Sequence, residues 1–331
     1  MSHLPHPPVT LLLLCYNQQD LIGEALAGAL AQDYPNLEIV ISDDASKDAT
    51  VARIEAALHG YAGPHRIKFL RNPENLGIGG NIDQAVRQSS GELIFIAGGD
   101  DVSLPTRVST VVDFWLAHDG KPDLIAAYLF DMAQSGEILG TIRITKLEDY
   151  RTLDDWSRSP PHVIGAAQAW TRRLFDRFGG MPKGVVGEDM VMAFRAIGLA
   201  SAITLPQPLI NYRRGGLTSQ RKSLDAATVI RGLTRKLKSS QTELRCMLDN
   251  ARELGASQAT LAVLDEKLQK EIFIERMFAA SGFGPKLGLC RQYATLPGDF
   301  RLRILTYAAA PWLLAPFFFL KRLRYQSATR P

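Results

Sequence analysis

Apolar runs of strand length recur through the first hundred residues, and polar loops follow them. The clearest are VTLLLLC at 9–15, LEIVISDD at 37–44 and ELIFIAGGDD at 92–101, with a shorter run, RIKFL, at 66–70. Continuous apolar runs of this length are typical of parallel strands buried on both faces. We therefore predict four strands, two of which end in aspartate pairs.

Helical patterns separate these runs. Leu21, Ala25, Leu26 and Ala29 recur at helical spacing, and Pro35 prevents the helix from continuing. Further helices are expected at 49–58 and 78–88. Strands that alternate with helices predict a right-handed, mostly parallel α/β sheet of Rossmann-like type with helices on both faces.

The later part of the chain is less regular. A strand is expected at 124–130, a polar loop at 152–161 and a helix at 189–197. From 225 to 280 long amphipathic helices are expected. Their apolar markers are Leu233, Leu237, Leu244, Leu248, Leu261, Leu264, Leu268 and Ile272. We predict an α/β domain over residues 1–222 and a helical C-terminal region over 223–331.

The segment at 304–320, ILTYAAAPWLLAPFFFL, is almost wholly apolar and is flanked by Arg301, Arg303 and Lys321. It is slightly shorter than the ~20 residues of a usual transmembrane helix and contains two prolines. We expect an interfacial or re-entrant membrane contact. The alternative is a helical hairpin that is buried against the core.

Charge is distributed unevenly. Residues 1–210 contain 17 Lys+Arg and 25 Asp+Glu, whereas residues 211–331 contain 21 and 9. An acidic first part suits a bound metal, and a basic last part suits an anionic surface, although solvated helix faces would give the same excess. Three widely spaced cysteines form no zinc pattern and indicate a reducing compartment. We expect no signal peptide and a cytoplasmic protein.

Polar groups follow three of the predicted strands: Tyr16-Asn17, Asp43-Asp44 and Asp100-Asp101. Ligands of open α/β sheets bind beyond the carboxyl ends of the strands. Two acidic pairs at one edge repel each other unless a cation or a ligand uses them. The alternative for each single aspartate is a helix cap or a turn residue.

The sequence GGDD at 98–101 suits a divalent cation, because it offers hard oxygen ligands on a glycine-rich turn. Mg²⁺ or Mn²⁺ held in this way completes its coordination with water and diphosphate oxygens. The chain contains no GxxxxGK[ST] loop, and IGGN at 78–81 does not form GxGxxG. These absences disfavour a P-loop enzyme and a dinucleotide dehydrogenase.

A further acidic pair, Glu188-Asp189, opens the helix predicted after Gly187. A carboxylate there is stabilised by the helix N-terminus, and this could be its whole role. Transfer to an acceptor hydroxyl, however, requires a carboxylate base.

The ordered motifs resemble family 2 of the inverting glycosyltransferases, which have the GT-A fold. The similarity is carried by VTLLLLCYNQQD, by QDYPNLEIVISDDASKDAT and by NPENLGIGGNIDQAVRQSSGELIFIAGGDDVSLP. It covers about residues 9–216, and its motifs occur in the expected order and at the expected separations.

The resemblance implies a role for each matching position. Asp100 would bind the metal beside Asp101, and Asp189 would be the catalytic base with Glu188 in support. Thr218 and Ser219 would close over the diphosphate. The residues implied to bind or shape the nucleotide site are Tyr16, Asp43, Asp44, Asn75, Gly77, Asn81, Asp101 and Arg213.

The chain departs from the family pattern at three places. Gly98 replaces the first aspartate of the usual D-x-D motif, which leaves coordination mainly to Asp100. Arg214-Gly215-Gly216 stands where a histidine is often found. No Q-x-x-R-W sequence follows the base, which argues against a processive polymerase.

The expected function is single-sugar transfer with inversion from a nucleotide-diphosphate sugar, with UDP favoured, in envelope polysaccharide or glycolipid synthesis. The acceptor would be a saccharide or a lipid-linked saccharide, and no nucleic-acid partner is expected. A peripheral contact with the inner face of the cell membrane accompanies this hypothesis. The alternatives are a sugar-nucleotide nucleotidyltransferase and a catalytically inactive nucleotide-binding module.

Overall fold

The computed structural model describes residues 6–215, 225–319 and 321. Thr218 and Ser219 lie outside the described residues. The chain divides into two compact units, one formed by residues 1–219 with 249–260 and the other by 220–248 with 261–331. The division therefore falls within two of the C-terminal helices.

One sheet organises the first unit, with the strand order β3-β2-β1-β4-β8-β6-β9-β5 and with β7 paired to β6. The strands are β1 (Val9–Cys15), β2 (Leu37–Asp43), β3 (Arg66–Arg71), β4 (Leu93–Gly98), β5 (Val102–Ser103), β6 (Leu124–Met132), β7 (Ile138–Ile142), β8 (Gln168–Thr171) and β9 (Ala202–Arg213).

The first four strands form the parallel half of this sheet, as predicted. Val9 of β1 pairs with Leu37 of β2 and with Leu93 of β4, and β2 pairs with β3. Every residue of β1 and β2 is buried, which explains their continuous apolar sequences.

The other half is mixed. β8 is antiparallel to both β4 and β6, while β9 is parallel to β6 and antiparallel to β5. Two reversals of direction leave β6 and β9 parallel to β4. The carboxyl ends of β6 and β9 therefore lie at the same edge as those of β1, β2 and β4.

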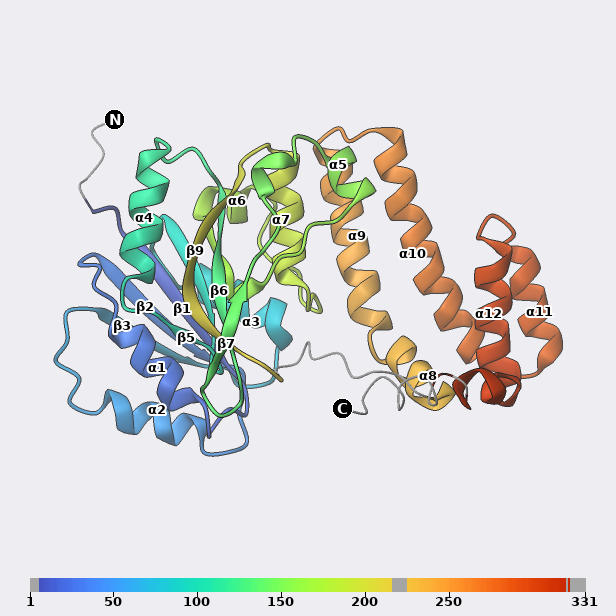
Figure 1. The fold of residues 1–331 in the computed structure, drawn as a ribbon, viewed down its shortest axis with the longest axis horizontal. Coiled ribbons are helices and arrows are strands. Elements are labelled where there is room, and N and C mark those ends of the chain that lie inside the picture. Colours follow the sequence, from blue (N-terminus) through green and yellow to red (C-terminus); the bar gives the residue numbers. More distant parts are fainter. Residues whose placement is uncertain (1–5, 216–224, 320, 322–331) are drawn as a thin grey trace. The chain divides into compact units, whose positions relative to one another are not determined.

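Helices cover both faces of the sheet (Figure 1). One face is covered by α1 (Ile22–Leu30), α2 (Thr50–Leu58) and α4 (Arg107–Ala117). The other is covered by α3 (Gly77–Arg87), α6 (Arg172–Arg177) and α7 (Glu188–Gly198). The unit also contains α5 (Leu153–Arg158) and the short 3₁₀ turns η1 (Leu147–Asp149) and η2 (Gly165–Ala167). The predicted α/β fold is confirmed.

All described elements after residue 225 are helical, which confirms the C-terminal helical extension. They are α8 (Ala226–Arg235), α9 (Leu237–Glu253), α10 (Gln258–Ala279), α11 (Phe283–Gln292), α12 (Gly298–Ala309) and η3 (Pro311–Leu314). The second unit has its own core, in which Phe273 packs with Met277, Tyr293 and Ile304.

No single helix among the described residues is long and apolar enough to cross a membrane. α12 and the following segment Pro311–Phe319 meet the length and composition criteria only as a pair, and they are bent by 114°. Residue 320, the last of the predicted apolar segment, lies outside the described residues.

Candidate active site

The predicted acidic pairs lie at one edge of the sheet. Cys15 at the end of β1 pairs with Asp43 of β2, and Leu14 pairs with Gly98 of β4. Because β1 lies between these parallel strands, the loops that follow all three emerge side by side. The polar residues after them are gathered at the edge where open α/β sheets bind ligands.

The Asp44 carboxylate organises the entry into α3. Its Oδ1 accepts hydrogen bonds from Asn72 Nδ2 at 2.9 Å and Leu76 N at 2.8 Å, and its Oδ2 accepts one from Gly77 N at 2.9 Å. Asn75 Nδ2 donates to the Asp44 carbonyl at 3.2 Å. Gly77 has φ +72°, a conformation that favours glycine. Asp44, Asn75 and Gly77 therefore build one loop, and their contact with a nucleotide stays a prediction.

Asp43 and Asn81 stabilise this region through hydrogen bonds next to the loop. Asp43 Oδ1 accepts a hydrogen bond from Ser46 N at 2.9 Å, and buried Asn81 accepts one from Ser42 Oγ. Burial, and then the Asp43 charge, raise the pKa of the Cys15 thiol. Cys15 is thus a neutral core thiol.

The loops after β1 and β2 are interlocked. Asn17 N donates to Ser46 Oγ at 2.8 Å, and Lys47 N donates to Asn17 Oδ1 at 2.7 Å. Asn17 and Ala45 have φ values of +51° and +63°, a region that non-glycine residues rarely adopt. Such backbone persists where its surroundings hold it in place. Tyr16 on the same loop is 46% exposed and presents its ring to solvent.

The loop after β4 carries two carboxyl groups, of which Asp101 is buried and Asp100 is half-buried. Burial raises the pKa of Asp100 despite a hydrogen bond from the Gln18 side chain. Burial, followed by the charge of Asp100, raises the pKa of Asp101 to about 7. Asp101 Oδ1 also accepts a hydrogen bond from Arg213 N at 3.0 Å. A cation would relieve the repulsion between these two groups.

These residues fit Mg²⁺ or Mn²⁺. In the part of the chain that the structure describes, no group of three or more His, Cys, Asp or Glu side chains could hold a metal. The carboxylates available at this loop are those of Asp100 and Asp101, and Asp100 would be the first ligand. This is the ligand set with which Mg²⁺ typically binds beside substrate phosphates.

Gly98 faces these carboxylates directly. A Cβ placed on Gly98 would lie 2.8 Å from Asp100 Oδ1 and 3.2 Å from Asp101 Oδ2. Any side chain at this position would thus point at the candidate metal site. A Cβ on Gly99 would collide with Gln18 Oε1 and lie 3.0 Å from Cys15 Cβ, so a side chain there would displace the Gln18 amide.

Arg213, at the end of β9, braces the same loop. Its guanidinium donates to Glu24 Oε2 at 2.8 Å, to the Asp100 carbonyl at 3.1 Å and to the Gln134 carbonyl at 3.2 Å. The side chain is only 3% exposed. Arg213 is therefore a positioning residue in this structure, and its predicted contact with a diphosphate stays a prediction.

The Glu188-Asp189 pair opens α7, as predicted. Glu188 is buried, whereas Asp189 is half-buried. Asp189 Oδ1 accepts a hydrogen bond from Met190 N at 2.7 Å, and its carbonyl accepts one from Gln168 Nε2 at 3.1 Å. The helix N-terminus favours a charged carboxylate here.

Two contacts connect the elements around this pair to the rest of the sheet. Arg107, which is fully buried, donates to the Ile96 carbonyl of β4 at 2.8 Å and to the Ala166 carbonyl of η2 at 2.7 Å. Gly79 N of α3 donates to the Val185 carbonyl, just before α7, at 3.1 Å. Hydrogen bonds therefore join β4 to η2, and α3 to the segment before α7, while the approach of Asp189 to the Asp100 loop stays a prediction.

Several of these residues escaped the sequence analysis: Gln18, Glu24, Arg107, Gly165 and Gln168. Arg107 had a usable signal, because it shares a helical face with Val108, Val111 and Val112, all of them buried. A cation at such a position must find polar partners inside the protein.

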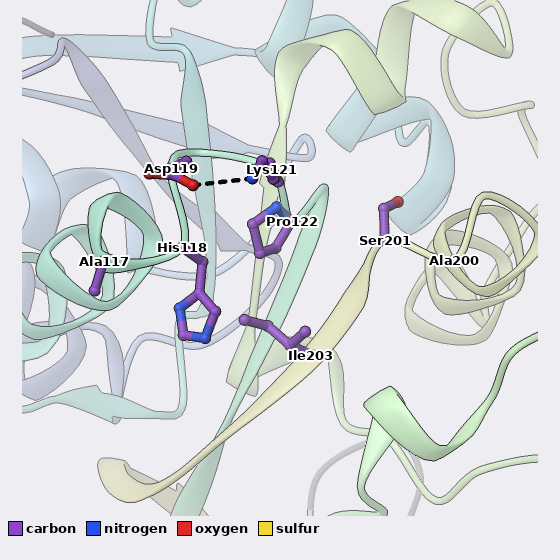
Figure 2. Close-up of a pocket in the computed structure, with 8 residues that line it drawn as sticks. All are labelled: Ala117, His118, Asp119, Lys121, Pro122, Ala200, Ser201 and Ile203. Atoms are coloured by element: carbon purple, nitrogen blue, oxygen red, sulfur yellow. Dashed lines mark hydrogen bonds and ion pairs between the residues drawn. The ribbon is translucent and has the colours of Figure 1, made fainter.

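A pocket at the opposite edge of the sheet has different chemistry (Figure 2). It lies between the turn after α4 and the turn before β9, and Figure 2 shows His118, Asp119, Lys121 and Ser201 among its lining residues. Asp119 is paired with Lys121 at 2.9 Å. This pocket is remote from the carboxyl ends of the strands and contains none of the predicted site residues.

Comparison with solved structures confirms the GT-A-type fold. S. aureus TarS 1-349 in complex with UDP-GlcNAc matches with a TM-score of 0.56 and 17% identity over 91% of this chain and 81% of that one. The mannosyltransferase PcManGT from Pyrobaculum calidifontis, in complex with GDP-Man and Mn²⁺, matches with a TM-score of 0.52 and 20% identity. The match covers 93% of this chain and 87% of PcManGT. At these identities the likeness concerns the fold.

Residues 10–177 match the family described as Glycosyl transferase family 2. The chain belongs to this family. It is 30% identical to the putative glycosyltransferase EpsE of Bacillus subtilis over 112 residues. This match covers 34% of this chain and 40% of EpsE. It is 32% identical to the succinoglycan biosynthesis protein ExoO of Rhizobium meliloti over 107 residues. This match covers 32% of this chain and 29% of ExoO. The matches thus span less than half the length of these relatives.

Gly165 offers a test of the acid pair. A Cβ on Gly165 would collide with Glu188 Oε1 and lie 3.6 Å from Asp189 Cβ. We expect Gly165→Ala to displace the pair and to lower donor turnover about a hundredfold, because small misplacements of catalytic groups are costly. Steady-state turnover of a nucleotide sugar measures this. Gly23→Ala is the matched control, since its Cβ meets no atom within 4 Å. Equal turnover in both variants would contradict a role for this contact.

Proposed function

We propose that the protein transfers a single sugar, with inversion, from a nucleotide-diphosphate sugar to an acceptor hydroxyl. The observation that carries this is the pair of desolvated carboxyl groups, Asp100 and Asp101, at the sheet edge that also holds the Asp44 loop. Residues 1–222 act as the catalytic domain, and residues 223–331 form the helical extension.

Asp100, with Asp101 beside it, would hold Mg²⁺ or Mn²⁺. When bound, the metal neutralises the diphosphate and stabilises it as a leaving group. Asp44, Asn75 and Gly77 shape the loop that receives the base and ribose, and exposed Tyr16 lies beside it. Arg213 holds the Asp100 carbonyl in place.

Asp189 acts as the base. It takes the proton of the acceptor hydroxyl while that oxygen forms a bond to the anomeric carbon, and the bond from that carbon to the diphosphate oxygen breaks. The nucleoside diphosphate departs with the electron pair. A single displacement of this kind inverts the anomeric configuration. Buried Glu188 supports Asp189 at the start of α7.

The similar proteins supply the substrate class for this proposal. ExoO is a succinoglycan biosynthesis protein, and the TarS and PcManGT complexes contain UDP-GlcNAc and GDP-Man. We favour a UDP-sugar donor and a saccharide or lipid-linked saccharide acceptor in polysaccharide or glycolipid synthesis. The work would take place in the cytoplasm, at the inner face of the cell membrane.

Gly98 favours one alternative function, that of an inactive module that binds nucleotides without turnover. Its lack of a side chain leaves one fewer oxygen directed at the candidate metal site. The nucleotidyltransferase alternative is weaker, because CYNQQD follows β1 where a glycine-rich basic loop is expected.

The proposal is tested by thermal unfolding with a panel of nucleoside diphosphates and their sugars, with and without Mn²⁺. A true donor at about a hundred times its Kd stabilises the folded state by about 2.7 kcal/mol. We expect a metal-dependent rise in the unfolding temperature of the wild type that is lost in Asp100→Ala and kept in Asp189→Ala. Asp249→Ala, at a side chain that is 71% exposed, is the control.

The outcomes separate the candidates. A panel without any stabilising nucleotide would contradict the proposal. Stabilisation by a nucleotide sugar that is never turned over, with water or with added saccharides, would favour the inactive module.

A further inference from the structure

The last described segment of the chain exposes a group of large apolar side chains. Trp312 is 71% exposed, and Leu313, Phe317 and Phe319 are 55%, 57% and 62% exposed. We call these four residues the apolar tip. They lie within Pro311–Phe319, which turns away from α12 by 114°.

The apolar tip is flanked by buried residues. Phe318, between two exposed phenylalanines, is buried, and so is Ile304 of α12, which belongs to the core of the second unit. The expectation of a buried hairpin thus describes Phe318 and Ile304 but not the four residues of the tip. A packed segment that keeps four large apolar groups in water needs another explanation.

Exposure of this kind is concentrated in one part of the chain. Among the described residues, eleven large apolar side chains are exposed, and seven of them lie between residues 283 and 319. The α/β unit, which carries the proposed active site, has the other four: Tyr16, Ile138, Leu139 and Val186.

The surroundings of the tip are basic. Residues 282–321 contain five Lys and Arg and one acid, Asp299. Arg291, Arg303 and Lys321 are exposed. The Arg303 guanidinium lies over the Phe300 ring at 5.7 Å, and Lys321 Nζ lies over the Phe318 ring at 5.9 Å. Lys321 therefore lies against the apolar segment itself, and Arg303 lies against Phe300 of α12.

We propose that the apolar tip inserts into the interface of a lipid bilayer that contains anionic lipids. Tryptophan and phenylalanine beside cations are suited to the boundary between headgroups and acyl chains. Each nearby Lys or Arg adds attraction to an anionic surface. This surface goes beyond the proposed sugar transfer and does not depend on it.

The length of the segment Pro311–Phe319 and the charge around it favour a lipid interface as the partner of the apolar tip. Nine residues of helix rise about 14–18 Å, less than the ~30 Å of a hydrocarbon core, so the segment would lie in one interface. A second copy of the chain would bring like charges together around the same tip, which opposes self-association through it.

Vesicle flotation of the full chain tests the proposal. We expect the wild type to float with vesicles of phosphatidylcholine plus phosphatidylglycerol and much less with phosphatidylcholine alone. The triple variant Trp312→Ser, Phe317→Ser, Phe319→Ser should lose flotation. Ile138→Ser with Leu139→Ser is the matched control, because these residues of β7 are 45% and 44% exposed. Arg303→Gln with Lys321→Gln should weaken binding to the anionic vesicles about thirtyfold.

Tryptophan fluorescence gives an independent readout. The chain has four tryptophans, all in the described residues, and Trp115, Trp156 and Trp170 are buried. Anionic vesicles should shift the emission of the wild type to shorter wavelength, and Trp312→Phe should abolish the shift while flotation persists.

Two results would overturn the proposal. One is equal flotation of the triple variant and the wild type. The other is a concentration-dependent dimer that the triple variant loses, without vesicle binding by either protein. Nucleotide-induced stabilisation should be the same in the triple variant and the wild type, so failure here leaves the proposed transfer untouched.

Discussion

Asp189→Asn should lower the rate of donor turnover by about two to four orders of magnitude, the usual contribution of a positioned general base. The amide keeps the size of the carboxylate but cannot take the acceptor proton. Nucleotide binding should persist, because Asp189 lies at the start of α7 and makes its described contacts with Met190 and Gln168. Rapid-quench or coupled assays of nucleoside diphosphate release would measure the change.

Asp155→Asn is the matched control for this substitution. Asp155 is also a first-turn acid, but it forms a capping box with Thr152 at the start of α5. Its loss should weaken the start of α5 and leave turnover near that of the wild type. Turnover in Asp189→Asn equal to that of this control would assign the base to another residue.

Arg107→Leu should lower the free energy of unfolding by about 3–5 kcal/mol, because it removes one partner of a buried charge pair. Arg107 is a buried cation whose charge acts on the buried Asp101 carboxyl, and it also satisfies the Ile96 and Ala166 carbonyls. Burial lowers the pKa of Arg107 to about 10, which leaves it charged at neutral pH. Urea denaturation would measure the loss.

A second buried arginine separates stability from function. Arg195 donates to Asn250 Oδ1 at 2.8 Å and to the Gly180 carbonyl at 2.9 Å. Arg195→Leu should also destabilise the fold, yet keep the metal-dependent stabilisation by nucleotides. Arg107→Leu should lose it. Retention in both variants would limit Arg107 to a purely structural role.

Three strands of the parallel half, β1, β2 and β4, could be predicted from sequence because they are buried on both faces. β1 and β2 appear as uninterrupted apolar runs for that reason. β9 was hidden by Pro206 and Pro208, which suggest a loop. The structure accommodates them where the register between β6 and β9 shifts, with Pro208 opposite Tyr128. β5, with two residues, has no pattern to detect.

The acidic residues of the candidate site could be predicted because strand ends are visible in the sequence. The residues that hold these acidic residues in place could not be predicted, because their contacts join distant parts of the chain. Glu24 meets Arg213 from 189 positions away, and Arg107 reaches Ala166 across 59. Local spacing carries no signal for such pairs.

The interlocked loops after β1 and β2 have a consequence for redesign. Asn17 holds Lys47 N, and Ser46 holds Asn17 N, so each loop completes the hydrogen bonding of the other. If only one of the two loops were replaced by that of a relative, the hydrogen bonds between the loops would lose one of their partners. Engineering of donor preference therefore has to exchange residues 16–19 and 45–48 together, as a single cassette.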